Sequence, residues 1–161
     1  MNKVGFIRSA REMAVEIAGR RAIQNLPGRL KDKGYLLRNV TSGPRDILNA
    51  CLLPSSPSAI LVNNILSYQA ARSLYENIHK LDEQQLCIGY YEDAKVSKPV
   101  EEIIQRAAEI AEEDSFSYGI EVYLLIAYSE LMRKKDPFLR EYKITPEKIR
   151  RTLEFLRQLK G

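Results

Sequence analysis

Short apolar runs of strand length alternate with segments of helical periodicity along the first 91 residues of this 161-residue chain. A short continuous apolar run is typical of a strand covered on both faces, and strands that alternate with helices favour a parallel sheet with right-handed crossovers. Helical periodicity begins near Ser9, Arg45 and Leu66. The expected strands are Lys3–Ile7, Tyr35–Val40, Ser58–Asn63 and Gln85–Tyr91. We therefore predict an α/β fold, with a small doubly wound parallel sheet of about four strands followed by a C-terminal helical segment.

The chain is helical in pattern after Lys98-Pro99. Residues 100–113 carry an apolar stripe on one face and a row of glutamates on the other. Residues 116–132 are apolar over most of the helix circumference, which predicts a helix buried on two sides. We accordingly predict an α/β domain at residues 1–98 and a helical segment at residues 99–161.

Polar side chains follow three of the expected strands. Ligands bind beyond the carboxyl ends of the strands in an open parallel sheet, so these side chains should gather at one edge. This edge is a candidate site for a ligand or a protein partner, and its residues are Arg11, Asn63, Asn64, Glu92 and Asp93. An enzyme that uses Glu92, Asp93 and Lys98 is an alternative, although adjacent acids in a loop are usually solvated.

Two segments resemble the receiver domain of bacterial response regulators: RLKDKGYLLRNV at residues 29–40 and SAILVN at residues 58–63, with Lys98-Pro99 after them. The resemblance implies a doubly wound domain over about the first hundred residues. Receivers carry acidic residues after the first strand and an aspartate after the third, whereas this chain has Arg11 and Asn63 there. An amide cannot form an acyl phosphate, so the resemblance implies a receiver without phosphotransfer or bound metal. Periplasmic-binding-protein-like sugar sensors have the same alternation of strands and helices. A lobe that binds a small molecule is therefore an alternative.

The stretch from Tyr142 to Leu156 has a well-specified helix start. Thr145 can act as the N-cap, Pro146 suits the first helical position, and Glu147 places a negative charge in the first turn. Ile144 and Ile149 have the spacing of a hydrophobic staple. A shorter helix with an aspartate cap, Asp136–Tyr142, is expected directly before it.

Residues 142–153, YKITPEKIRRTL, resemble the turn and recognition helix of bacterial helix-turn-helix regulators. The resemblance covers residues 136–160, and Lys143 stands where such turns usually have glycine, so that residue would need a positive φ. A single short helix contacts few base pairs, so the resemblance also implies a dimer. The residues that it implies would face DNA are Thr145, Glu147, Lys148, Arg150 and Arg151.

The charges are unevenly distributed along the chain. Residues 81–130 carry twelve acidic and three basic side chains, whereas residues 131–161 carry ten basic and four acidic ones, and the first 45 residues are also basic. A basic C-terminal segment suits phosphate contacts. Neutralisation of these blocks across the folded surface, or docking with another protein, is the alternative.

Several site classes are excluded or disfavoured. Cys51 and Cys87 lack metal-ligand spacing, and His79, the only histidine, falls on a polar helix face, so we predict no metal, no cofactor and no catalytic residues. No apolar run is long enough for a membrane span and the N-terminus lacks a signal-peptide core, which predicts a cytoplasmic protein without membrane contact.

These patterns favour a non-enzymatic regulatory protein. The main hypothesis is a DNA-binding transcriptional regulator with a receiver-like domain that cannot be phosphorylated. The alternative is a protein-interaction subunit of a larger assembly, which could include nucleic acid.

Overall fold

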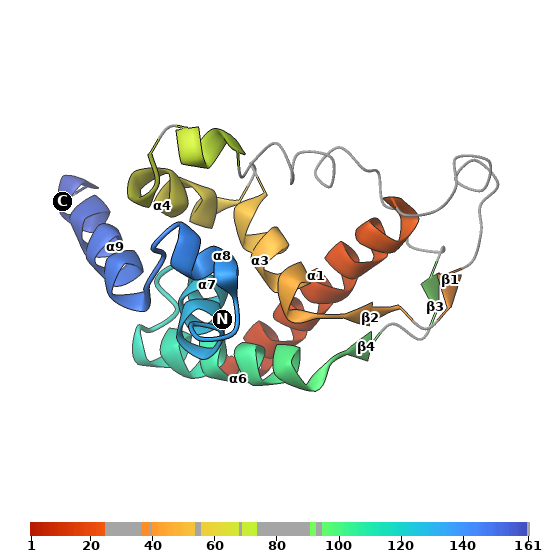
Figure 1. Ribbon diagram of the computed structural model, residues 1–161. Helices are drawn as coiled ribbons and strands as arrows, with labels where there is room; N and C mark the ends of the chain where they lie inside the picture. Colours follow the sequence, from red (N-terminus) through yellow and green to blue (C-terminus); the bar gives the residue numbers. More distant parts are fainter. Residues whose placement is uncertain are drawn as a thin grey trace.

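The computed structural model describes residues 1–24, 37–38, 40–53, 56–67, 69–73, 91–92 and 95–160, and this part of the protein is mostly helical (Figure 1). Its helices are α1 (Lys3–Gln24), α3 (Pro44–Leu52), α4 (Pro57–Ile65), α6 (Lys98–Glu113), α7 (Ile120–Leu131), α8 (Pro137–Glu141) and α9 (Pro146–Lys160). Its strands are β1 (Leu37–Arg38), β2 (Thr41–Ser42), β3 (Tyr91–Glu92) and β4 (Lys95–Val96).

The predicted doubly wound sheet is wrong. The strands are two residues long and form two separate parallel pairs, β1 with β3 and β2 with β4. The second pair continues through a hydrogen bond from the Ser97 amide to the Ser42 carbonyl, and α3 and α6 begin directly after it. The strands therefore bring two helix starts together and do not form the core.

The first expected strand, Lys3–Ile7, lies inside α1. The Asn2 side chain accepts a hydrogen bond from the Gly5 amide at 2.8 Å, which caps the helix start. Phe6 is buried, and Ala10 and Ala14 follow it at intervals of four residues, also buried. The buried positions of the helix therefore already include Phe6, whereas the sequence predicts a helix that starts near Ser9.

The third expected strand, Ser58–Asn63, lies inside α4. Ser56 is the N-cap and Pro57 occupies the first helical position. Leu61 and Val62 are buried, whereas Ile60 is 58% exposed, so the run is not covered on both faces. A Ser-Pro start before a short apolar run was the local signal for a helix.

The other predicted segments of the first 98 residues have mixed outcomes. The helix expected at Arg45–Leu53 is confirmed as α3. Of the strand expected at Tyr35–Val40, residues 37–38 form β1. Residues 69–73 are helical, as expected for the segment 66–81. Most of the rest of that helix, His79 and residues 85–90 of the fourth expected strand lie outside the described residues.

Helix α7 forms the centre of the core. All residues from Val122 to Ser129 are buried, which confirms the prediction of a helix buried on more than one side. It packs against α6, α3, α9 and α4. One cluster of buried residues includes Phe6 and Leu48 as well as Tyr123 and Ile149. Long helices from both halves of the chain therefore share one hydrophobic core.

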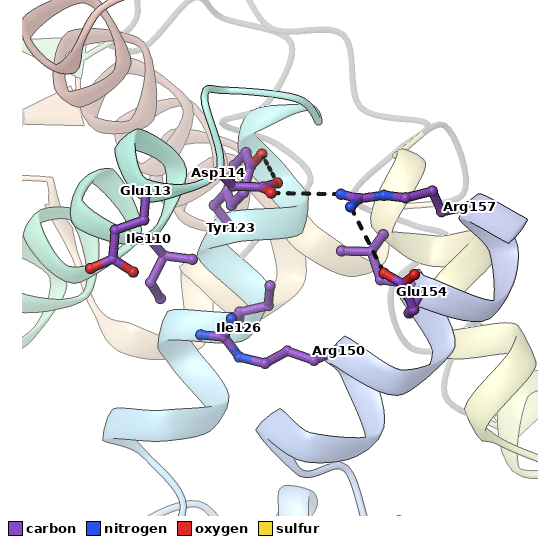
Figure 2. A pocket seen from close by; sticks show the side chains of 9 residues that line it. Ile110, Glu113, Asp114, Tyr123, Ile126, Arg150, Glu154 and Arg157 are labelled. Carbon is purple, nitrogen blue, oxygen red and sulfur yellow. Dashed lines mark hydrogen bonds and ion pairs between the residues drawn. The ribbon is translucent and has the colours of Figure 1, made fainter.

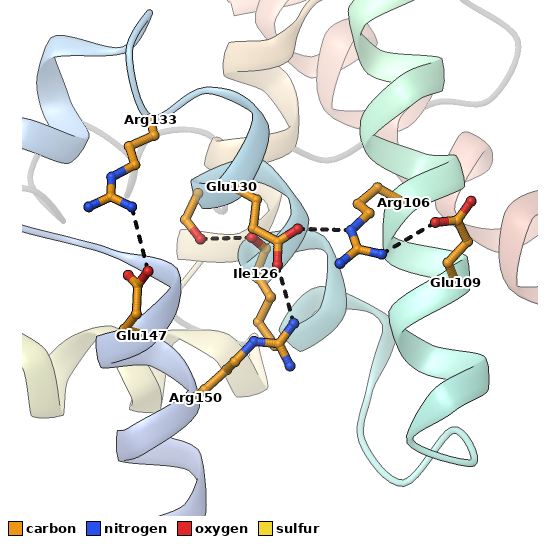
Figure 3. Close-up of polar contacts among 8 residues, drawn as sticks. Arg106, Glu109, Ile126, Glu130, Arg133, Glu147 and Arg150 are labelled. Atoms are coloured by element: carbon orange, nitrogen blue, oxygen red, sulfur yellow. Dashed lines mark hydrogen bonds and ion pairs between the residues drawn. The ribbon is translucent and has the colours of Figure 1, made fainter.

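Ion pairs join the oppositely charged segments of the sequence. Arg11 on α1 pairs with Glu101 on α6. Glu130 on α7 pairs at 3.2 Å with Arg150 of α9, in the basic C-terminal segment, and also at 2.8 Å with Arg106 of α6, within its own acidic segment (Figure 3). Part of the charge asymmetry is thus neutralised across the folded surface. Helices α4 and α9 lie side by side at the end of the molecule opposite the strands (Figure 1).

Candidate functional site

The connection between α8 and α9 has the backbone geometry of a Schellman turn. The Ile144 amide donates to the Leu139 carbonyl at 2.9 Å, the Lys143 amide donates to the Arg140 carbonyl at 3.3 Å, and Lys143 has a φ of 54°. Lys143 therefore adopts the left-handed conformation that the helix-turn-helix resemblance required. The turn directs the chain into α9 with Ile144 buried beneath it.

The start of α9 follows the local prediction. The Thr145 hydroxyl accepts a hydrogen bond from the Lys148 amide at 3.2 Å, and Pro146 is the first helical residue. Ile144 and Ile149 are both buried, as expected for a hydrophobic staple. Asp136 likewise caps α8 by accepting a hydrogen bond from the Phe138 amide at 2.9 Å.

The residues that the helix-turn-helix resemblance assigned to DNA have different environments. Lys148 and Arg151 are exposed and form no ion pair with any residue that the structure describes. Glu147 is exposed but pairs with Arg133 at 3.5 Å, and Arg150 pairs with Glu130 (Figure 3). The pKa of Glu147 is lowered, most by a hydrogen bond from its own backbone amide and further by Arg133. Thr145 is partly buried and serves as the helix cap described above.

The described residues among the five expected at the sheet edge do not meet at a common strand edge. Arg11 is on α1, where it pairs with Glu101 of α6, while Asn63 and Asn64 are exposed on α4. The Asn64 side chain donates to the Ile60 carbonyl at 2.8 Å, within its own helix. Glu92 lies in β3, paired with Arg38 of β1, and Asp93 is outside the described residues. Two of the strands expected to bring these residues to one edge, Lys3–Ile7 and Ser58–Asn63, are helices.

An open groove of about 610 Å³ lies between α4, the segment 114–119 and α9. Its wall is mainly apolar and combines residues from three distant parts of the chain. Asp114, Ser117, Tyr118 and Arg157 add polar groups at its boundary. The apolar lining residues are Pro57, Ile60, Leu61, Val122, Leu153 and Leu156.

Asp114, Leu153 and Arg157 line both this groove and a second hollow of about 270 Å³, which Figure 2 shows. Arg157 Nε donates to Tyr118 Oη at 2.6 Å, and its guanidinium lies 5.2 Å from the centre of the Tyr118 ring. Its other nitrogens are 3.6 Å from Asp114 and 3.8 Å from Glu154. The hydrogen bond to Tyr118 raises the pKa of Arg157 the most. These contacts hold the C-terminal half of α9 against the segment 114–119, which connects α6 to α7.

The outer face of α9 combines cations with apolar side chains. Lys148, Arg151, Phe155 and Leu159 are spaced by three or four residues, so they lie on one face of the helix. Phe155 is 55% exposed and Leu159 is 68% exposed. Leu159 is also three residues from Leu156, which lines the groove. We call Ile60, Leu156 and these four residues the α4–α9 surface.

The described residues include no group of three or more His, Cys, Asp or Glu side chains placed to hold a metal ion. Cys51 is fully buried, its Sγ donates to the Glu121 carbonyl at 3.4 Å, and burial raises its thiol pKa. No helix in the described part of the chain is both long and apolar enough to cross a bilayer. No protein-family model, no curated protein and no solved structure matches the chain.

Sequence reasoning missed the groove itself. Ile60 and Leu61 fall within an expected buried strand, and no sequence pattern connects Tyr118 with Arg157. Once Pro57 is recognised as a helix start, α4 has an exposed face without charged side chains, and this face is the feature that could have indicated the groove. The partners of that face are about 60 and 100 residues further along the chain, so no local pattern identifies them.

Proposed function

We propose that this protein is a non-enzymatic protein-interaction subunit and that a polypeptide segment of its partner binds on the α4–α9 surface. The observation that carries the proposal is the exposed apolar surface formed by Ile60, Phe155 and Leu159 beside the open groove. Large apolar side chains grouped on a surface commonly mark protein-interaction sites. A groove between two helices also suits a helix-in-groove mode of recognition.

A polypeptide fits this surface better than a small molecule. The groove has a ligand-sized volume of about 610 Å³, but the apolar surface continues from Leu156 across Leu159 to Phe155 on the outside of α9. A small ligand held within the groove would leave those outer side chains in water. A partner segment that runs along α9 would cover both parts.

Selection of peptides tests this proposal. The full-length protein is used to select from a phage-displayed library of random 16-residue peptides, and selected peptides are measured by fluorescence anisotropy. We expect enrichment, and we expect Ile60→Gln to weaken binding because the replacement puts a polar group on the apolar wall. Val4→Gln is the matched control, since Val4 is an exposed aliphatic residue on α1. No enrichment, or equal effects of the two substitutions, contradicts the proposal.

Duplex DNA binding by α9 is the second candidate. The positive φ of Lys143 and the exposure of Lys148 and Arg151 favour it. Two features make it the weaker proposal: Glu147 and Arg150 are engaged in ion pairs, and Phe155 and Leu159 would gain little from a phosphate backbone. It predicts salt-dependent binding to duplex DNA that is lost in Lys148→Gln/Arg151→Gln and unaffected by Ile60→Gln. Absence of salt-dependent binding rules it out.

The cytoplasm remains the proposed compartment, as inferred from the sequence. Self-association through the same surface is one way in which a partner segment could be supplied. Sedimentation of the full-length protein, with and without Ile60→Gln, distinguishes a second copy from a different partner.

A further inference from the structure

We infer that the partner segment is an acidic amphipathic helix, whose apolar side covers Phe155, Leu159 and the groove and whose carboxylates face Lys148 and Arg151. This inference rests on the proposed function. It adds the charge and the secondary structure of the partner, which the apolar surface alone does not specify.

Helix α9 carries two acidic residues. Its acidic residues, Glu147 and Glu154, are directed to Arg133 and Arg157 and are therefore engaged with the protein itself. Lys148 and Arg151 have no such partner among the residues that the structure describes. The face of α9 that carries Lys148, Phe155 and Leu159 is consequently basic and apolar, and Glu147 and Glu154, four and three residues from Arg151, border it. A partner with acidic residues is complementary to this face.

The spacing of the residues on this face of α9 favours a helical partner. Lys148, Thr152, Phe155 and Leu159 repeat at intervals of four, three and four residues, which is the spacing of a heptad seam. Thr152 is partly buried, whereas Lys148, Phe155 and Leu159 are exposed. A second helix packed along the seam would place its apolar residues against Phe155 and Leu159. Its flanking acidic positions would then lie opposite Arg151 and Lys148.

A nucleic acid is less complementary to the same face. Phosphates would satisfy Lys148 and Arg151, but Phe155 lies between the two cations and Leu159 on the helix face and would remain in water. An acidic helix satisfies the cations and removes the apolar groups from water in one contact. We therefore assign the surface to a protein helix, and nucleic acid binding becomes an outcome of the test.

The test uses the peptides selected above, synthesised with blocked ends, in native form and with every Glu and Asp replaced by Gln and Asn. We expect the native peptides to be acidic and to become helical when bound, as measured by circular dichroism. The amide versions should bind about tenfold more weakly at low salt, with a smaller difference at high salt. Lys148→Gln/Arg151→Gln should reproduce that loss for the native peptides, mainly through slower association.

Lys134→Gln/Lys135→Gln is the matched control. Both lysines are exposed and without an ion pair to any described residue, and the double substitution changes the net charge by the same amount. It should alter binding less than twofold. Charge exchange provides a second test: Lys148→Glu/Arg151→Glu should bind peptides whose acids are replaced by Lys, and should do so better than the unmodified protein.

The outcomes separate this inference from the proposed function. Peptides that depend on Ile60 but are neutral or basic, or that bind equally well in amide form, overturn the acidic helix and leave the interaction surface intact. Equal effects of the Lys148/Arg151 and Lys134/Lys135 substitutions overturn it as well, because net charge alone would then explain the result. Duplex DNA that competes for Lys148 and Arg151 while no peptide is enriched overturns both proposals.

Discussion

Removal of the Tyr128 hydroxyl should destabilise the fold through one buried hydrogen-bond network. Tyr128 on α7 donates its hydroxyl proton to Asp136, the cap of α8, and both residues are buried. Asp136 also accepts from the Phe138 amide at 2.9 Å and lies 3.3 Å from Arg45 of α3. Burial and then the hydrogen bond with Asp136 raise the pKa of Tyr128, so the hydroxyl stays protonated at neutral pH. The network therefore joins three helices through one carboxylate.

Tyr128→Phe removes one oxygen and keeps the ring, so it opens no large cavity. A hydrogen bond to a charged group contributes about 1.5–3 kcal/mol net, and Asp136 retains its contacts with Phe138 and Arg45. We therefore expect the free energy of unfolding to fall by about 2 kcal/mol. For a chain of this length that corresponds to a midpoint temperature lower by roughly 4–8 °C. Urea denaturation at pH 7, followed by circular dichroism, measures the change.

Tyr142→Phe is the control for this measurement. Tyr142 is partly buried with its ring centre 4.6 Å from that of Phe138, and its hydroxyl has no hydrogen-bond partner among the described residues. It should change the free energy of unfolding by less than about 0.5 kcal/mol. A double-mutant cycle with Asp136→Asn should give a coupling of about 1 kcal/mol or more for Tyr128. If Tyr128→Phe costs no more than Tyr142→Phe, the buried network does not stabilise the fold as argued.

Four further predictions follow from the same structure. Leu125→Ala, at a fully buried position of α7, should lower the free energy of unfolding by about 3 kcal/mol in urea; a loss below about 1 kcal/mol contradicts the packing. Lys143→Gly should raise it by about 1 kcal/mol because the φ of 54° is strained for lysine, and a decrease would contradict that cause. Burial raises the pKa of Tyr123 from 10.0 to about 12. The stability that depends on the protonated hydroxyl is therefore present below pH 10 and is lost as the pH rises to about 12. Across that pH range, urea denaturation should show a smaller loss in the free energy of unfolding for Tyr123→Phe than for the unmodified protein. In a Cys87→Ser variant, Cys51 should react with a thiol reagent only as fast as the protein unfolds, because the thiol is buried and its pKa is raised. Rapid labelling of the native protein would contradict the buried position of Cys51.

Local signals determined several elements without any tertiary information. The caps at Asp136 and Thr145, with proline directly after each, specify where α8 and α9 begin, because the hydrogen bonds involved join residues two or three positions apart. The composition of residues 116–132 also predicted a helix buried on more than one side. A helix apolar around its circumference has no other stable environment in water.

Helices α1 and α4 were not predictable from local patterns alone. Lys3–Ile7 and Ser58–Asn63 are short apolar runs, and periodicity alone does not distinguish a buried strand from a helix over such a length. Packing of α1 on α6 and of α4 on α9 makes the helix the stable choice in each case. The predicted sheet is wrong for that reason, and the described residues expected at its edge lie on α1, α4 and β3.

The sequence alone therefore determined helix starts and the burial of α7, and it placed basic residues on α9. Only the tertiary structure decided which of those residues remain available, because Arg150 and Arg157 contact Glu130 and Asp114, whereas Lys148 and Arg151 pair with no residue in the described part of the chain. It also formed the groove, whose walls come from residues 57–61, 114–122 and 153–157. A helix start depends on neighbours in the chain, whereas a binding surface depends on contacts between distant segments, and those exist only after the core has formed.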